Sequence, residues 1–305
     1  MKHDLKRGAL LLASATFFVA ALNALQKLTG TRLPALEIIF FRNLFSLPFV
    51  LLIASRTGII LRTHHFRGHL IRSVVGLISM IMVVITVTRL PLAEQQVLSY
   101  TQPLFLVLLS IPLLHERPSL QRWIAVLIGF SGVVVVALGK GLLNTSATSV
   151  STAIYLLALA QGAVGALTTM QIRQLSATEA STTISLWQAI LMTVMTAAPL
   201  PFIWVTPGWQ DGLCLVIVGG FAGIAQVLQT EAFASAQVSA IGPFAYTGLL
   251  WAALIGWLGF GEIPSSAMAA GAVLIIGSGV WMLRHDRASK ARDAIVATVE
   301  TAEGS

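Results

Sequence analysis

A glutamine followed by a proline, Gln102-Pro103, lies near the middle of a long apolar run. Proline has no backbone N–H, so Pro103 cannot donate to the Ser99 carbonyl and tends to kink a helix. Inside a membrane such irregular backbone is tolerated where it lines a cavity or packs against protein. A freed carbonyl beside a glutamine amide therefore predicts a polar pocket that hydrogen-bonds a small molecule.

Arg42 lies roughly 10 Å, or about two helical turns, inside the apolar stretch that begins at Ala35. An unpaired charge at that depth is costly and is usually functional. One interpretation is that the guanidinium faces a central cavity and binds a carboxylate or phosphate of the substrate. The other is a structural ion pair with Glu94, Glu37 or a helix-end carbonyl.

Glu94 opens another apolar stretch, where the helix dipole stabilises a carboxylate. The alternative is that Glu94 acts as a gate partner of Arg42 and closes one mouth of the cavity.

The other candidate substrate-binding residues are amides and aromatic side chains inside apolar runs. They are Asn23, Tyr100, Gln161, Trp187, Gln188, Gln226, Tyr246 and Trp251. The competing explanation is hydrogen bonding between helices for the amides and core or lipid packing for the aromatic residues. Of six intramembrane amides, which also include Gln26 and Gln229, we expect two or three to face the cavity.

Enzyme motifs are missing from the sequence. There is no G-x-x-x-x-G-K-[ST], H-E-x-x-H or G-x-S-x-G pattern. The single cysteine, Cys214, excludes a disulfide framework within one chain. His64, His65 and His69 have no cysteine or carboxylate at ligand spacing. We therefore expect no catalytic residue, no metal site and no cofactor.

The composition is that of an integral membrane protein. The chain is 56% hydrophobic and only 10% charged, with a mean hydropathy of +0.85, whereas a soluble domain is about 25% charged. The net charge of +7 does not indicate nucleic-acid binding, because the basic residues lie between apolar runs and after the last one, next to lipid head groups. The expected partners are a lipid bilayer and a small-molecule substrate, without nucleic acid.

Ten apolar stretches are long enough to span a membrane, which predicts an all-α protein of ten transmembrane helices. The stretches are Gly8–Leu28, Ala35–Ser55, Leu70–Thr88, Leu92–Leu114, Arg122–Gly139, Ser151–Gln174, Ala180–Val205, Gly212–Phe233, Val238–Phe260 and Ser265–Leu283. The first has no good cleavage site, so we interpret it as a spanning helix and not as a secretory signal. With both termini in the cytoplasm, most of the 19 Lys and Arg residues lie on that side.

The chain matches itself at an offset of 146 residues, the distance from Tyr100 to Tyr246. Glu116-x-Pro118-Ser119 then aligns with Glu262-x-Pro264-Ser265, and this repetition favours capping or interhelical anchoring by both glutamates. The repeated unit has five helices, so its second copy is inverted, as in many secondary transporters. We predict a first repeat at 1–140, a second at 141–284 and a cytoplasmic tail at 285–305.

The chain resembles the ten-helix EamA group of the drug/metabolite transporter superfamily. The resemblance rests on Leu90-Pro91-Leu92-Ala93, Tyr100-Thr101-Gln102-Pro103-Leu104-Phe105, Leu114-His115-Glu116-Arg117-Pro118, Gly129-x-x-Gly132-Val133 and Phe41-Arg42. It implies a secondary transporter of the bacterial inner membrane that works by alternating access. The runs Phe40–Asn43 and Leu61–His64 look most like the S-adenosylmethionine-uptake branch.

The resemblance does not define the substrate or the direction of transport. Amino acids, amino-acid derivatives such as S-adenosylmethionine, exported metabolites and riboflavin-type vitamins all stay open, as does a non-transporting membrane subunit. A homodimer is one of the possible oligomeric states. In the second repeat Gln188 replaces Arg42, Leu249 replaces Pro103 and Ala240 replaces Glu94, so we expect a site biased toward the second and fourth helices.

Overall fold

The computed structural model describes residues 5–57, 63, 65–114, 120–139, 149–235, 241–281 and 284. These residues form helices and short connections, and no strand is found among them. Six described helices or helix pairs are long and apolar enough to cross a membrane, and four shorter apolar helices accompany them. The prediction of an all-α, multi-pass membrane fold is confirmed.

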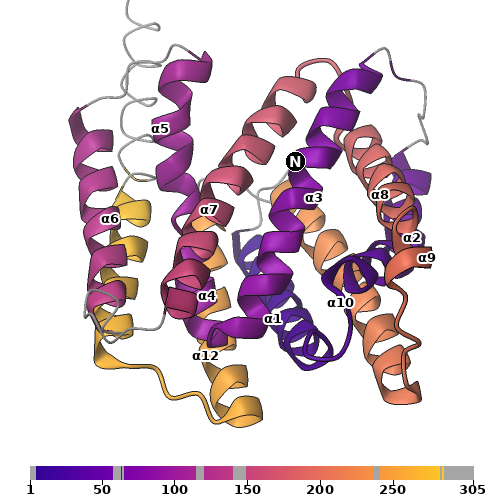
Figure 1. Cartoon of the computed structure of the whole chain (residues 1–305). Coiled ribbons are helices and arrows are strands. Elements are labelled where there is room, and N and C mark those ends of the chain that lie inside the picture. Colours follow the sequence, from indigo (N-terminus) through magenta and orange to yellow (C-terminus); the bar gives the residue numbers. More distant parts are fainter. Residues whose placement is uncertain are drawn as a thin grey trace, which may run out of the picture.

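The elements follow one another in a simple order (Figure 1). They are α1 Leu5–Thr29, α2 Ala35–Thr57, α3 Phe66–Arg89, α4 Leu92–Ser99, α5 Gln102–Leu114, α6 Leu120–Gly139, α7 Ser149–Leu175, α8 Ser181–Ala197, α9 Leu200–Ile203, α10 Trp209–Ser235, η1 Gly242–Tyr246 and α12 Thr247–Phe260. A last described helix, Ser266–Trp281, is here called the C-terminal helix.

The helix break predicted at Gln102-Pro103 is confirmed. α4 ends at Ser99 and α5 begins at Gln102, with Tyr100 and Thr101 in a turn between them. A second break precedes α12, where η1 is a 3-10 helix that contains Pro243. Both breaks have a proline close by, because a missing N–H interrupts the helical hydrogen-bond ladder.

One predicted helix is shorter than expected. The stretch Ala180–Val205 was predicted as a single span, but α8 ends at Ala197 and the four-residue α9 follows. Pro199 and Pro201 explain the end of α8, since neither residue can donate a backbone hydrogen bond to the preceding turn. Glu116, Pro118 and the tail 285–305 lie outside the described residues.

Packing divides the bundle into a main body and an edge. α1, α10, α2 and α8 contact one another in that order, while α3 packs on α7 and α12 packs on α1 and α4. At the edge, α6 and the C-terminal helix lie side by side (Figure 1). Gly132 and Gly271 bring these two backbones together, because a Cβ on Gly132 would lie 2.7 Å from the Gly271 carbonyl oxygen. The main body therefore brings α1, α7 and α8 together around α3, which contacts all three.

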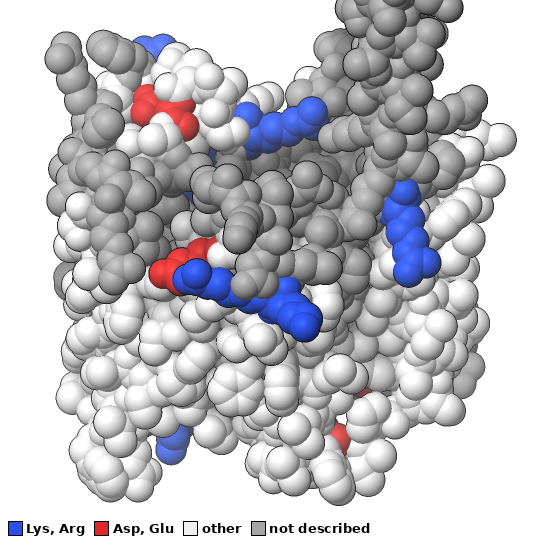
Figure 2. Space-filling model, turned by 180° about the vertical axis from the view of Figure 1, so that it is seen from behind, with Lys and Arg blue, Asp and Glu red and all other residues white. Residues whose placement is uncertain are grey.

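The two ends of the bundle differ in their charged residues. At one end Arg7 at the start of α1 meets Glu231 near the end of α10, and we call this the basic end. At the other, Lys27 near the end of α1 meets Glu262 after α12, and we call this the Lys27 end. Between the ends, uncharged residues cover most of the described surface on the face shown in Figure 2.

Candidate functional site

A cavity of about 390 Å³ lies at the centre of the main body, and we call it the central cavity. Helices α1, α2, α3, α4, α5, α7 and α8 all contribute to its wall. Its described lining residues are Val19, Asn23, Arg42, Gly76, Ser79, Met80, Val83, Gln95, Gln96, Ser99, Gln102, Gly165, Thr168, Thr169, Ile172 and Gln188. This size lies within the range of about 300–1,000 Å³ that is typical of small-molecule sites.

Four of the predicted site residues meet in this cavity: Asn23, Arg42, Gln102 and Gln188. Arg42 extends from α2 and is partly buried. Among the described residues no carboxylate forms an ion pair with it. The structural ion pair that the sequence left open for Arg42 therefore has no partner in the described part of the chain.

Gln102 lies in the first turn of α5, directly after the helix break. Its Nε2 donates to the Thr169 hydroxyl at 2.8 Å and to the Gly165 carbonyl at 3.2 Å, both on α7. These two bonds use both N–H groups of the amide. They fix its orientation and leave the carbonyl oxygen Oε1 as its remaining polar atom.

Gln188 lies on α8, at the position that corresponds to Arg42 in the other half of the chain. Its Oε1 accepts a hydrogen bond of 2.6 Å from Nη2 of Arg72. Arg72 is only 5% exposed, and its Nε and Nη1 have no partner among the described residues. A second buried guanidinium therefore lies directly behind the wall of the central cavity.

Sequence reasoning missed Arg72 because it seemed to lie at the edge of the predicted span that began at Leu70. The structure begins α3 at Phe66 instead, four residues earlier. The helical spacing of Gly68, Arg72 and Gly76 places the three on one face, and this pattern could have identified the buried position. The lining residues Gln95, Gln96, Ser99, Thr168 and Thr169 were also missed as site residues.

A second cavity, of about 720 Å³, lies at the basic end between the start of α3 and the end of α7. Gly68 and Leu175 line this cavity, while Gly76 and Ile172 line the central one. The two cavities thus follow each other along the same pair of helices, and Arg72 occupies the turn of α3 between them.

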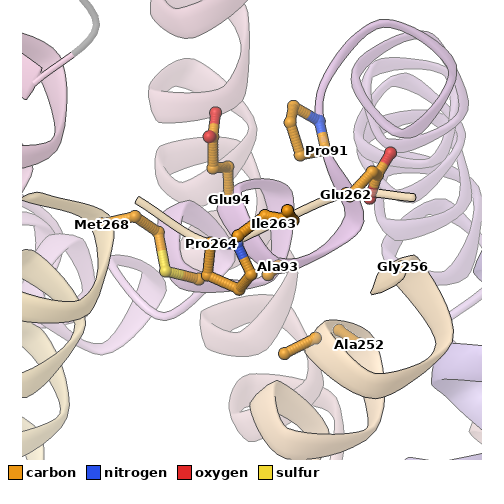
Figure 3. Close-up of a pocket in the computed structure, with 10 residues that line it drawn as sticks. Pro91, Ala93, Glu94, Ala252, Gly256, Glu262, Ile263, Pro264 and Met268 are labelled. Carbon is orange, nitrogen blue, oxygen red and sulfur yellow. The ribbon is translucent and has the colours of Figure 1, made fainter. Parts of the chain in front are cut away.

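The Lys27 end is closed. The space there measures only about 10 Å³, and Figure 3 shows Glu262 beside Pro91 and above Gly256. Lys27 pairs with the Glu262 carboxylate and donates to the Leu90 carbonyl at 2.6 Å. The backbone N–H of Leu92, the first residue of α4, donates to Glu262 Oε2 at 2.8 Å. The predicted capping and anchoring role of Glu262 is therefore confirmed.

Glu94 lies near the Lys27 end and outside the central cavity. It is 3% exposed and accepts a hydrogen bond from the Tyr155 hydroxyl of α7. Its carboxylate points away from that of Glu262 (Figure 3). Gln161, also on α7, is buried and accepts a hydrogen bond of 3.4 Å from Ser99 Oγ. Both residues join α4 to α7 beside the cavity.

The predicted aromatic residues make contacts between helices. The rings of Tyr100 and Tyr246 meet edge-on with centroids 4.9 Å apart. Trp187 stacks on His69 near the basic end, and Trp251 donates from Nε1 to the Ala13 carbonyl at 3.2 Å. None of these four rings is among the described lining residues of the central cavity.

The last predicted residue, Gln226, lies on α10. Its side chain is exposed, and it is not among the described lining residues of the central cavity.

Known proteins resemble the chain over most of its length. It is 30% identical over 277 residues to the pseudopaline exporter CntI of Pseudomonas aeruginosa, covering 89% of this chain and 94% of the relative. A riboflavin transporter of Brucella anthropi is 27% identical, covering 88% and 95%. An S-adenosylmethionine uptake transporter of Rickettsia bellii is 25% identical, covering 88% and 90%. These relatives carry the names of transporters and not of enzymes.

A solved structure and a protein family also match the chain. A solved crystal structure superposes with a TM-score of 0.63 at 20% identity, covering 90% of this chain and 96% of the other. The EamA-like transporter family matches the chain twice, at residues 6–138 and 152–284. Together the two matches cover most of the 305 residues. The chain therefore belongs to the EamA-like transporter family.

Proposed function

We propose that the chain is a secondary carrier that moves a small organic metabolite across the bacterial inner membrane by alternating access. The observation that carries this proposal is the central cavity, whose wall is supplied by seven helices and includes five amide side chains. Polar groups are rare inside membrane proteins unless they bind one another or a ligand. Their convergence on one cavity favours a substrate site over a purely structural subunit.

The proposed architecture is ten helices in two inverted repeats, at 1–140 and 141–284, with both termini in the cytoplasm. The two separate family matches support two repeats. The helix breaks support them as well, because Tyr100 and Tyr246 adjoin the two breaks and correspond at the offset of 146 residues. In this orientation the basic end faces the cytoplasm, which follows the usual excess of positive charge on that side.

The two ends support alternating access. In this structure the Lys27 end is sealed by Lys27 and Glu262, whereas a cavity of about 720 Å³ opens at the basic end. In the proposed orientation these features support a carrier state that is accessible from the cytoplasm. The complementary state requires the contacts of the Lys27 end to separate and α3 to close on α7 at the basic end.

Purified protein in liposomes tests the proposal. We expect it to exchange at least one compound from a panel containing amino acids, S-adenosylmethionine, riboflavin and other cellular metabolites. Gln102→Leu should weaken apparent affinity by about tenfold, the effect of losing one or two hydrogen bonds. Gln229→Leu is the matched control, since Gln229 is an exposed amide on α10 outside the cavity.

Two outcomes would contradict this proposal. If no compound in the panel crosses the bilayer while the protein stays folded, the structural-subunit alternative is favoured. If Gln102→Leu and Gln229→Leu behave alike, the substrate site lies outside the central cavity.

A further inference from the structure

The described wall of the central cavity carries one formal charge, the guanidinium of Arg42, and no carboxylate. A guanidinium is always protonated and offers five N–H donors. No ion pair or hydrogen bond to a described residue uses these donors. A cation kept inside a membrane protein without a fixed counter-charge is suited to bind an anion that comes and goes.

The Arg72–Gln188 bond adds a second donor to the same wall. Since Oε1 of Gln188 accepts from Arg72, the amide is oriented with its Nε2 as the free end. That nitrogen reaches only the Met192 sulfur, at 3.7 Å, and a thioether is a weak acceptor. Arg72 thus leaves Nε2 as the polar atom of Gln188 without a strong partner among the described residues, and Gln188 lines the cavity although Arg72 itself is not among the described lining residues.

Gln102 offers a hydrogen-bond acceptor to the cavity, whereas Gln188 offers a donor. Its N–H groups are used by Thr169 and Gly165, so its Oε1 can only accept. Arg42 and Gln188 come from α2 and α8, which pack on each other, whereas Gln102 comes from α5, which packs on α7. Arg42 and Gln188 therefore place donors on the α2–α8 side of the cavity and Gln102 places an acceptor on the α5–α7 side, while the amides of Asn23, Gln95 and Gln96 also line the wall.

The described part of the cavity wall also lacks a stacking surface. None of the described lining residues is Phe, Tyr, Trp or His, although planar ligands are commonly held between aromatic or apolar faces. This composition does not favour a flavin or a nucleobase as the main recognised group. It is suited to a compact, non-planar molecule.

From this arrangement we propose that the carrier recognises a compact carboxylate that also bears an N–H or O–H donor, such as an amino acid or an N-substituted amino acid. Arg42 and Nε2 of Gln188 bind the carboxylate, and Oε1 of Gln102 accepts from the donor group. Arg72 is a positioning residue, which acts by orienting Gln188. The inference rests on the proposed carrier function and specifies its substrate class.

The first test uses liposomes that contain the protein and are loaded with a bacterial metabolite extract. Mass spectrometry identifies the compounds that leave through the wild-type carrier but not through Arg42→Gln. We expect these compounds to carry a carboxylate and a hydrogen-bond donor. Arg89→Gln is the matched control, because Arg89 is an exposed arginine in the last turn of α3 and is not among the lining residues.

The outcomes separate the two proposals. If the exported compounds lack a carboxylate, or carry only phosphate as their anion, the substrate class is wrong and the carrier function stands. If Arg42→Gln exports the same carboxylates at the wild-type rate, the assignment of Arg42 is wrong. If no compound leaves through the wild-type protein, the carrier proposal fails and this inference fails with it.

The second test addresses Arg72, using the carboxylate that crosses fastest and its carboxamide as probes. We expect Arg72→Gln to raise KM for the carboxylate by about tenfold, the effect of one charge-assisted hydrogen bond, and to leave KM for the carboxamide nearly unchanged. The change should vanish when Gln188 is already replaced by Met, because the two residues act as one unit. Arg72→Lys should restore part of the affinity, since lysine can also donate to Gln188.

A structural role for Arg72 gives a different pattern. In that case Arg72→Gln lowers the amount of folded protein or raises KM equally for both probes, and it does so whether residue 188 is Gln or Met. Either pattern would falsify the positioning role.

Discussion

The Lys27 end is closed and the basic end is open, and the polar contacts at the two ends differ. At the Lys27 end a single carboxylate, Glu262, joins three segments that are far apart in the sequence: the end of α1, the start of α4 and the connection after α12. At the basic end the ion pair between Arg7 and Glu231 is 3.9 Å long and largely exposed, while Glu179 after α7 accepts a hydrogen bond of 2.5 Å from Thr63 and lies 3.9 Å from His69 on α3. The difference teaches where each end should be sensitive to substitution: the Lys27–Glu262 pair is buried and joins three segments, whereas the Arg7–Glu231 pair is exposed.

Exposure predicts that the two ion pairs differ in strength. The side chains of Lys27 and Glu262 are 15% and 16% exposed, against 65% and 40% for Arg7 and Glu231. Exposed pairs contribute about 0–1 kcal/mol, whereas removing one partner of a buried pair costs about 3–5 kcal/mol. We therefore expect the ends to respond very differently to matched substitutions.

Glu262→Gln should have the largest effect. It leaves Lys27 without a counter-charge and destabilises the closed Lys27 end by roughly 3 kcal/mol, which shifts the population of the two states by about 100-fold. The measurement is the labelling rate of a cysteine introduced at Met268, which lines the small space beside Glu262, by a membrane-impermeant maleimide. Cys214→Ser provides the background, since Cys214 is the only cysteine.

The matched substitution at the other end is Glu231→Gln. We expect it to leave the labelling rate at Met268→Cys within about twofold of the parent, because an exposed ion pair is weak. Equal acceleration by Glu262→Gln and Glu231→Gln would show that the Lys27–Glu262 pair does not control closure.

Tyr155→Phe should have the next largest effect. It removes the hydroxyl that donates to buried Glu94, and loss of one hydrogen bond to a buried carboxylate costs about 1–3 kcal/mol. We expect a lower midpoint of thermal unfolding in detergent and faster labelling at the Lys27 end. The double variant that combines Glu94→Gln with Tyr155→Phe should be less destabilised than Tyr155→Phe alone, since no charge is then buried. A loss that is merely additive would mean that the pair is not energetically linked.

Gly256→Ala should have the smallest effect. A Cβ at this position would lie 2.7 Å from Glu262 Oε2, so the carboxylate must move to make room. Because the end of a glutamate side chain is flexible, we expect labelling to accelerate by only about two- to fivefold, equivalent to less than about 1 kcal/mol. Gly259→Ala is the control, as nothing lies within 4 Å of a Cβ there. An equal response of both variants would exclude a steric effect on Glu262.

The sequence alone predicts features that depend on local composition. Long apolar stretches predicted the membrane spans, and Pro103 predicted the break between α4 and α5. Gln102 and Arg42 were recognised as site candidates because a polar group inside an apolar run is visible without a structure. The end of α8 was missed, because hydropathy continues through Pro199 although the backbone hydrogen bonding does not.

Contacts between distant segments could not be predicted. Lys27 and Glu262 are 235 residues apart, and although the repeated Glu-x-Pro-Ser pattern predicted an anchoring role for Glu262, nothing in the sequence identified Lys27 as its partner. Arg72 and Gln188 are 116 residues apart, and only the packing of α3 on α8 brings them together. The donor and acceptor sides of the cavity arise from such pairings. The amide residues in the sequence therefore do not predict which side of the cavity donates hydrogen bonds and which side accepts them.

The edge-on contact between Tyr100 and Tyr246 joins the two broken helices at their breaks, and the Tyr100 hydroxyl also donates to the Ala245 carbonyl at 3.2 Å. In the proposed alternating-access mechanism this contact would act as a fulcrum. If the two halves rock against each other, points at a fulcrum move least, while Glu262 at one end and Gly68 at the other travel furthest. A small rotation about two tyrosine rings would then be enough to exchange the open end for the closed one.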